Sequence, residues 1–296
     1  MNHRSWLILV LLTQISCSDT SDVYSVEKEA ATENATASED INVTDDVSVA
    51  EDVNVVEQET ASAGGDDPIP DFSQYKDVKE KKLAFFGYLS PLVKTVNDQI
   101  WTERLWIVEN RQGLIDGNLD SSQEATLVGL LNRYSVDVPE KLADADIEKL
   151  LERVDVVPAS LILAQAANES AWGTSRFALE GRNFFGIWCY SPGCGLTPSR
   201  RDAGAKHEVR VFDSVQDGVA YYAHMINTGS AYQRLRTLRA NSRAESTKPT
   251  GVELAAGLIR YSQRGQAYVD EIRAMIRQNG LSKYLIDRAN LDAGNY

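Results

Sequence analysis

One acidic residue stands inside the most apolar helical stretch of the sequence. Glu169 lies in the run LAQAANESAWG at residues 163–173, and helical spacing places it on one face with Gln165 and Trp172. Burial among apolar groups disfavours an ionised carboxylate and raises its pKa. A carboxyl group that keeps its proton near neutral pH can donate it to the oxygen of a breaking bond. On composition alone, the alternative of an exposed glutamate without a role at a helix end stays open.

Two motifs, in this order and at this spacing, resemble a known family. Residues 163–173 resemble the glucosaminidase motif of glycoside hydrolase family seventy-three, and NFFGI at residues 183–187 resembles the motif that follows it there. Residues 188–195 and 261–268 are similar to segments of one bacterial member. The resemblance covers residues 150–280 well and residues 76–150 more loosely. It implies a mostly helical, lysozyme-like α+β fold in which a small β-hairpin lies beside a substrate groove.

The resemblance also implies an activity and a set of site residues. Glu169 would be the general acid of an endo-β-N-acetylglucosaminidase that cleaves the β-1,4 glycan strands of peptidoglycan. Asn183 would bond sugar or backbone through its amide, and Phe184 would stack on a sugar ring. The residues expected to bind substrate are Trp172, Asn183, Phe184, Tyr261 and Tyr268.

A second catalytic group is harder to assign. Hydrolysis by two carboxylates needs a second acid, and Glu208 on the predicted hairpin is the tentative candidate. Better-known family members carry this acid on the earlier hairpin strand, but residues 196–201 contain none here, and Asp202 lies at the turn. Asp202, a water held by Tyr261, and the acetamide group of the substrate itself therefore stay open as alternatives.

Two cysteines five residues apart flank a Pro-Gly turn. In an oxidising compartment, Cys189 and Cys194 can close a small disulfide loop. Two free thiols, or a metal site, are the other interpretations. A metal site needs more ligands, and the chain has only 3 histidines. We therefore expect a structural disulfide, no metal and no cofactor.

Hydrophobic periodicity predicts the helix that must carry Glu169. It begins at Pro158, which suits a first helical turn, and runs to Trp172, with Gly173 as its stop. Pro91 is expected to kink or break the N-terminal helical stretch, which we interpret as two helices. The other predicted helices cover residues 76–89, 91–112, 122–134, 145–154, 176–179, 215–227, 232–244, 250–259 and 268–278.

The β-structure is predicted from one alternating run. Residues 208–212 alternate apolar and polar side chains as a half-buried strand does. Residues 196–201 are its expected partner, with residues 202–205 as the turn between them. Ser214 and its neighbour Asp213 are expected to cap the helix that follows.

The N-terminus has the pattern of an export signal. A short positive region is followed by an apolar core that is too short to span a bilayer, and the pattern ends at Cys17. Residues 1–17 resemble a lipoprotein-type signal peptide, although Gln14 stands where that motif usually has Leu. Simple secretion is the alternative. We expect an exported, periplasmic protein anchored through a lipid on Cys17, with the outer membrane weakly favoured.

Charge is concentrated in one segment. The whole chain has a formal net charge of -13. Residues 19–67 contain fifteen acidic residues and one lysine, which is a net charge of -14. The rest of the chain therefore has a net charge of +1. We expect an acidic disordered tether over residues 18–70. The near-neutral remainder offers no basic face for nucleic acid. The other predicted divisions are a helical extension (71–145), a glucosaminidase domain (146–285) and a tail (286–296), in a monomeric protein.

Three other functions were weighed against hydrolysis of glycan strands. A lytic transglycosylase would also use a Glu followed by Ser on a helix, but it would give 1,6-anhydro ends. A non-catalytic peptidoglycan-binding protein would not need the intact motifs at residues 169–173 and 183–187. A protease or amidase lacks a Ser/His/Asp or Cys/His arrangement.

Overall fold

The computed structural model describes residues 68–137, 139, 141–199, 204 and 206–284. The predicted signal peptide with Cys17, the tether up to residue 67, Asp202 and the tail lie outside the described residues. No helix in the described ranges is long and apolar enough to cross a membrane. The helices are α1 (Val78–Asp116), α2 (Ser121–Arg133), α3 (Asp144–Arg153), α4 (Ala159–Glu169), α5 (Arg176–Gly181), α6 (Val215–Thr228), α7 (Gln233–Ala244), α8 (Gly251–Leu254) and α9 (Gln266–Gln278), and the strands are β1 (Trp188–Cys189), β2 (Gly195–Leu196) and β3 (Glu208–Arg210).

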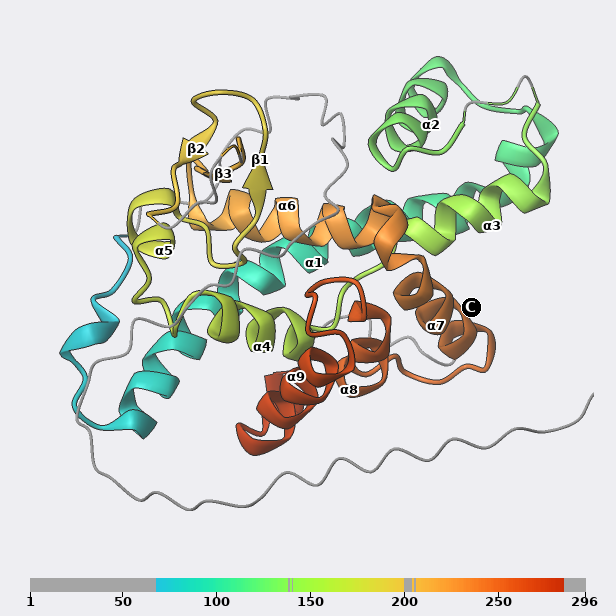
Figure 1. The fold of residues 1–296 in the computed structure, drawn as a ribbon. Coiled ribbons are helices and arrows are strands. Elements are labelled where there is room, and N and C mark those ends of the chain that lie inside the picture. Colours follow the sequence, from blue (N-terminus) through green and yellow to red (C-terminus); the bar gives the residue numbers. More distant parts are fainter. Residues whose placement is uncertain (1–67, 138, 140, 200–203, 205, 285–296) are drawn as a thin grey trace, which may run out of the picture. The chain divides into compact units, whose positions relative to one another are not determined.

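Helix α4 is the centre of the main core. Every residue from Ala159 to Ala167 is buried, as its almost unbroken apolar sequence requires. The helix packs against α1 on one side and against α8 and α9 on another (Figure 1). Glu169 is the last residue of α4, so the fold holds it at the end of its most buried element.

The helix α1 is continuous through Pro91, so the predicted break there is wrong. Pro91 itself is exposed, and the carbonyl that loses its partner belongs to Gly87, where solvent can replace the missing bond. Leu89 and Val93, on either side of the proline, are both 0% exposed in the main core. Packing of this face therefore keeps the helix together across a residue that usually breaks one.

A second, smaller core joins the C-terminal half of α1 to α2 and α3. Its members include Ile107, Leu131 and Leu150, which are almost completely buried. The first half of α1, by contrast, contributes Phe85 and Leu89 to the core that surrounds α4. The predicted division near residue 145 stays a prediction, but the main core draws on residues from both sides of it.

The sheet contains a strand that the sequence pattern did not reveal. Three short strands pair antiparallel in the order β1-β3-β2, so β3 is central. Pairing of Leu196 with Val209 confirms the predicted partners at residues 196 and 208–210, while Trp188 pairs with the same Val209 from the other side. Gly195 is needed in β2 because a Cβ there would lie 2.0 Å from the Val209 carbonyl oxygen.

Most helices lie where periodicity predicts them. Ser214 caps α6, because its side chain accepts from Asp217 N at 3.0 Å. The stretch predicted as one helix at residues 250–259 is instead the short α8 followed by a 3₁₀ segment, η3 (Ala255–Leu258). A second 3₁₀ turn, η2 (Ser230–Tyr232), leads into α7.

A buried ionic cluster holds the segment just before α4. Asp155 is 2% exposed and faces the guanidinium groups of Arg104 at 3.8 Å, Arg239 at 3.6 Å and Arg243 at 2.8 Å. Arg239 is itself 1% exposed and also donates to the carbonyl oxygens of Glu152, Asp155 and Val156. The cluster joins α1 and α7 to the chain that enters α4.

Candidate active site

Glu169 is half-buried, and its two oxygens differ in surroundings. Oε1 accepts a hydrogen bond from the Tyr268 hydroxyl at 2.7 Å and from Asn168 Nδ2 at 3.3 Å. Oε2 accepts none from the residues that the structure describes. A Cβ at Gly186 would lie 3.9 Å from Oε2, so the absence of a side chain at this glycine keeps space next to that oxygen. One oxygen is held by hydrogen bonds, and the other has no hydrogen-bond partner among the described residues.

Burial dominates the electrostatics of Glu169. Loss of solvent raises the pKa of its carboxyl above the ordinary value of 4.5, and the hydrogen bonds from Tyr268 and Asn168 oppose that rise. Farther charges act in both directions, since Glu271 raises the pKa and Arg264 lowers it. Because no cation among the described residues pairs directly with Glu169, the proton is retained to a higher pH than on an ordinary glutamate. This is the property that a general acid needs.

The turn after Glu169 corrects the predicted position of Trp172. Helix α4 ends at Glu169, and Ala171, Trp172 and Gly173 follow with left-handed φ values of 51°, 60° and 76°. A Cβ at residue 173 would come within 2.4 Å of the Phe72 ring, so this tight turn requires glycine. Trp172 therefore does not share a helical face with Glu169, because the chain has already left the helix.

Trp172 lies in an aromatic cluster with the first turns of α1. Its ring meets those of Phe85 and Phe86 edge to face, with centroids 5.5 Å apart in each pair, and Lys82 Nζ is 5.0 Å from its centroid. The ring is only half-buried. A role in binding substrate stays a prediction for Trp172, and the accessible part of the ring is compatible with it.

The two predicted groove tyrosines are buried. Tyr261 and Tyr268 are each 2% exposed and stack on one another with centroids 5.4 Å apart. The Tyr261 hydroxyl donates to the Phe185 carbonyl oxygen at 2.9 Å, and the Tyr268 hydroxyl donates to Glu169. A role in binding sugar stays a prediction for both, and the contacts present in the structure are with the protein. Tyr261 fixes the 183–187 loop, and Tyr268 fixes the carboxyl group.

Asn183 and Phe184 also belong to the interior. Phe184 is 0% exposed and Asn183 1%. Asn183 Nδ2 donates to the carbonyl oxygens of Ile187 and Arg210, each at 2.9 Å. Its Oδ1 accepts from Phe185 N and Ile187 N. Of the two predicted partners of its amide, the backbone is the one present. These residues shape the loop that brings Gly186 to Glu169, and their predicted contact with substrate stays a prediction.

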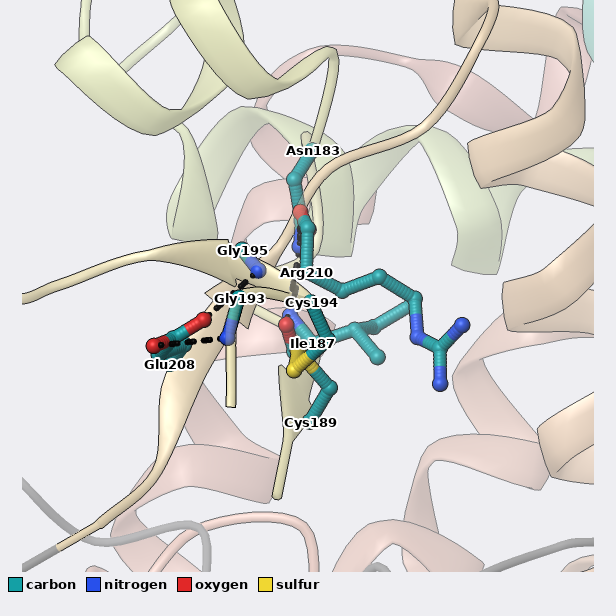
Figure 2. Close-up of a disulfide and its surroundings, with 8 residues drawn as sticks. All are labelled: Asn183, Ile187, Cys189, Gly193, Cys194, Gly195, Glu208 and Arg210. Atoms are coloured by element: carbon teal, nitrogen blue, oxygen red, sulfur yellow. Dashed lines mark hydrogen bonds between the residues drawn. A yellow bond between two sulfur atoms is a disulfide. The ribbon is translucent and has the colours of Figure 1, made fainter. Parts of the chain in front are cut away.

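Glu208 holds the disulfide loop. Its Oε1 accepts from Gly193 N at 3.2 Å and its Oε2 from Gly195 N at 2.8 Å, so Figure 2 shows the carboxylate directed at the loop backbone. The tentative assignment of Glu208 as the second catalytic carboxylate stays a prediction, while both of its oxygens hold the loop in place. The reason is local, since a turn with unpaired N–H groups attracts an acceptor.

The predicted disulfide between Cys189 and Cys194 is confirmed. These two residues and Glu208 form the group of possible metal ligands whose atoms lie within 4.8 Å of one another in the described part of the chain. Because the two sulfur atoms are bonded to each other, they are not available as thiolate ligands, and the carboxylate of Glu208 braces the loop.

Two residues near Glu169 were missed as site residues. Gln165 was placed on the face of Glu169 without a role, and its Nε2 donates to the Tyr268 hydroxyl oxygen at 2.9 Å. Tyr222 on α6 donates to Gln165 Oε1. The i, i+4 spacing of Gln165 and Glu169 is a signal that could have found the first. No pattern in the sequence connects Tyr222, 57 residues away along the chain, to the site.

Comparisons with known proteins identify the family of this chain. The family model described as "Glucosaminidase: Mannosyl-glycoprotein endo-beta-N-acetylglucosaminidase" matches residues 144–281, which include Gln165, Glu169 and Tyr268. The chain is 30% identical over 211 residues to "Protein bax" of Escherichia coli (strain K12), which covers 71% of this chain and 74% of that protein. No solved structure matches the chain significantly. The chain belongs to the glucosaminidase family of glycoside hydrolases.

Proposed function

We propose that the protein is a peptidoglycan hydrolase that cleaves β-1,4 glycan strands as an endo-β-N-acetylglucosaminidase, with Glu169 as the general acid. The observation that carries the proposal is the environment of Glu169. Its pKa is raised by burial, Oε1 is held by Tyr268, and Oε2, which lies near Gly186, accepts no hydrogen bond from the described residues. Such a carboxyl can give its proton to the leaving glycosidic oxygen as the bond to the sugar breaks.

The second role in the reaction is assigned to the substrate. Glu208 has both oxygens engaged in the disulfide loop, and Glu271, whose charge acts on Glu169, is paired with Arg264 at 2.7 Å. We therefore favour assistance by the substrate's own acetamide oxygen, which attacks the anomeric carbon as the leaving group is protonated. Water then opens the ring that forms.

The experiment that tests the function is digestion of purified peptidoglycan, with the new chain ends identified by mass spectrometry. We expect the wild-type protein to release reducing N-acetylglucosamine ends and Glu169→Gln to release none. Glu208→Gln is the matched control for losing a carboxylate, and it should keep the wild-type products. Anhydromuramic ends would show a lytic transglycosylase, and an undigested polymer with bound wild-type protein would show a binding protein.

Acetamide assistance has a test of its own. A thiazoline analogue of N-acetylglucosamine mimics the ring formed by attack of the acetamide, so it should inhibit the wild-type enzyme competitively. An absence of inhibition, together with loss of activity in a folded Glu208→Gln variant, would instead assign the second role to Glu208.

Export and anchoring are proposed on the N-terminal sequence. We propose that Cys17 carries a lipid and that the protein acts in the periplasm, where its substrate and an oxidising environment for Cys189 and Cys194 coincide. Labelled palmitate should enter the wild-type chain and not Cys17→Ala. Labelling of neither chain would favour simple secretion.

A further inference from the structure

A chain of hydrogen bonds leads from the core to Glu169. Tyr222 donates its hydroxyl proton to Gln165 Oε1. Gln165 Nε2 donates to the Tyr268 hydroxyl oxygen at 2.9 Å, and the Tyr268 hydroxyl donates to Glu169 Oε1 at 2.7 Å. Tyr222 and Gln165 are each 0% exposed, so protein groups and not solvent decide how they are oriented.

The donors and acceptors of these side chains allow the series of hydrogen bonds to run in only one direction. An amide donates only from nitrogen and accepts only on oxygen, and a phenol has a single proton to donate. Because the proton of Tyr222 goes to the amide oxygen of Gln165, the amide nitrogen faces Tyr268. The hydroxyl oxygen of Tyr268 accepts there, and its only proton is left for Glu169. Burial raises the pKa of both phenols well above their usual range, so both protons are retained.

We propose that Gln165 and Tyr222 are positioning residues for the reaction, an inference that rests on the proposed function. They hold Tyr268 as an obligatory donor to Oε1 of Glu169, and they thereby place the acidic proton on Oε2. Oε1 already accepts from Tyr268 and Asn168, whereas Oε2 lies beside Gly186 and accepts no hydrogen bond from the described residues. The proton is thereby placed on the oxygen that has no hydrogen-bond partner among the described residues, where it is left for the substrate.

The direction of these hydrogen bonds also affects the pKa of Glu169. Burial raises the pKa of its carboxyl, and the hydrogen bond from Tyr268 is the largest of the effects that lower it. If the amide of Gln165 turned over, its oxygen would compete for the proton of Tyr268. Glu169 would then lose that bond, and the pKa would rise further. Gln165 and Tyr222 therefore act on the acid through Tyr268, without touching the substrate.

The test removes the group that orients the amide and keeps its packing. Tyr222→Phe retains the ring that stacks on Phe185, with centroids 4.3 Å apart, and deletes only the hydroxyl. We expect the basic limb of the pH profile of kcat/KM to move to higher pH. We also expect kcat to fall roughly tenfold, the effect of about one hydrogen bond, with little change in KM. Gln165→Glu, which accepts from both phenols, should move the limb in the same direction.

Tyr261→Phe is the matched control. It deletes a buried hydroxyl from a ring that stacks on Tyr268, but that hydroxyl donates to the Phe185 carbonyl and lies outside the chain of bonds. Its basic limb should stay at the wild-type pH. If Tyr222→Phe lowers only the unfolding temperature and leaves the limb in place, its role is structural and the proposal is wrong.

A substrate-free readout separates this inference from the proposed function. Carboxyl ¹³C NMR of Glu169 should give a higher pKa in Tyr222→Phe than in the wild type. If Glu169→Gln proves active on peptidoglycan, the proposed function fails, and the NMR titration still tests the hydrogen-bond chain. If Glu169→Gln is inactive but Tyr222→Phe titrates as the wild type does, the chain alone is overturned.

Discussion

The two ends of α4 carry carboxylates with opposite properties. Asp155 lies just before the helix, is 2% exposed and has a pKa lowered to about 2. Glu169 ends the helix, is half-buried and has a pKa raised above 4.5. Burial is the largest cause acting on each and raises the pKa of both.

Their partners explain the difference. Arg104, Arg239 and Arg243 together outweigh burial at Asp155, so this group is ionised and serves the fold. At Glu169, by contrast, neutral Tyr268 and Asn168 reduce the rise in pKa without reversing it. A buried carboxylate is therefore not itself a sign of chemistry. Within the part of the chain that the structure describes, Asp155 has direct cationic partners and Glu169 has none, and this distinguishes the structural acid from the catalytic candidate.

The largest expected effect is on the activity of Glu169→Gln. Loss of the proton donor should reduce kcat/KM on peptidoglycan at least roughly a hundredfold. The free energy of unfolding in urea should change by less than about 1 kcal/mol, because a neutral amide replaces a group that is easily neutralised. Turbidity clearing of cell walls measures the first quantity. A folded variant with wild-type clearing would remove Glu169 from the mechanism.

Asp155→Asn should show the reverse pattern. It leaves the buried guanidinium of Arg239 without its counter-charge, so the free energy of unfolding should fall by about 3–5 kcal/mol. Activity of the fraction that stays folded should change much less than in Glu169→Gln. Urea denaturation and clearing assays on the same preparation measure both. A loss below about 1 kcal/mol would contradict the structural role of the cluster.

The pH dependence of stability sharpens the contrast. The pKa of Asp155 is about 2 in the folded chain against an ordinary 3.8, so its contribution is complete above pH 3.8 and is lost as the pH falls towards 2. The loss amounts to about 2 kcal/mol and should be absent from Asp155→Asn. Burial and Arg133 lower the pKa of His224 from 6.5 to about 4. As the pH falls from 6.5 to 4, the unfolded chain therefore takes up a proton at this residue before the folded chain does, and the folded state loses stability in this separate window. A flat wild-type curve between pH 4 and 2 would contradict the assignment.

The smallest expected effect belongs to Glu208→Gln. In the wild type, each carboxylate oxygen accepts from one backbone N–H group, of Gly193 or Gly195. The amide of the variant keeps only one of these acceptors, so the free energy of unfolding should fall by about 1 kcal/mol. Activity should stay within about twofold of the wild type. Thermal unfolding and clearing assays measure these changes, and a hundredfold loss of activity with intact folding would restore Glu208 as a catalytic residue.

The sequence predicts the elements whose signals are local. The periodic helices, the Ser214 cap and the Cys189–Cys194 disulfide all follow from short-range patterns. Packing overrides the local rule at Pro91, where buried neighbours keep α1 continuous. The two-residue strand β1 is too short for any alternation to reveal it.

The site shows the same limit. A helical wheel places Gln165 beside Glu169, but it cannot show that Trp172 follows a left-handed turn. Aromatic residues in a motif suggest a groove, whereas Phe184 and Tyr261 are buried and act through packing and backbone contacts. The partners of Glu169 come from 99 residues away in the case of Tyr268, and only the fold brings them together.

One titration tests the central contrast directly. Carboxyl ¹³C NMR of the wild-type protein, with Asp155→Asn and Glu169→Gln used to assign the signals, follows both groups in one sample. We predict that Asp155 titrates at about 2 and Glu169 above 4.5. A Glu169 pKa at or below 4.5 would contradict its role as the retained-proton donor.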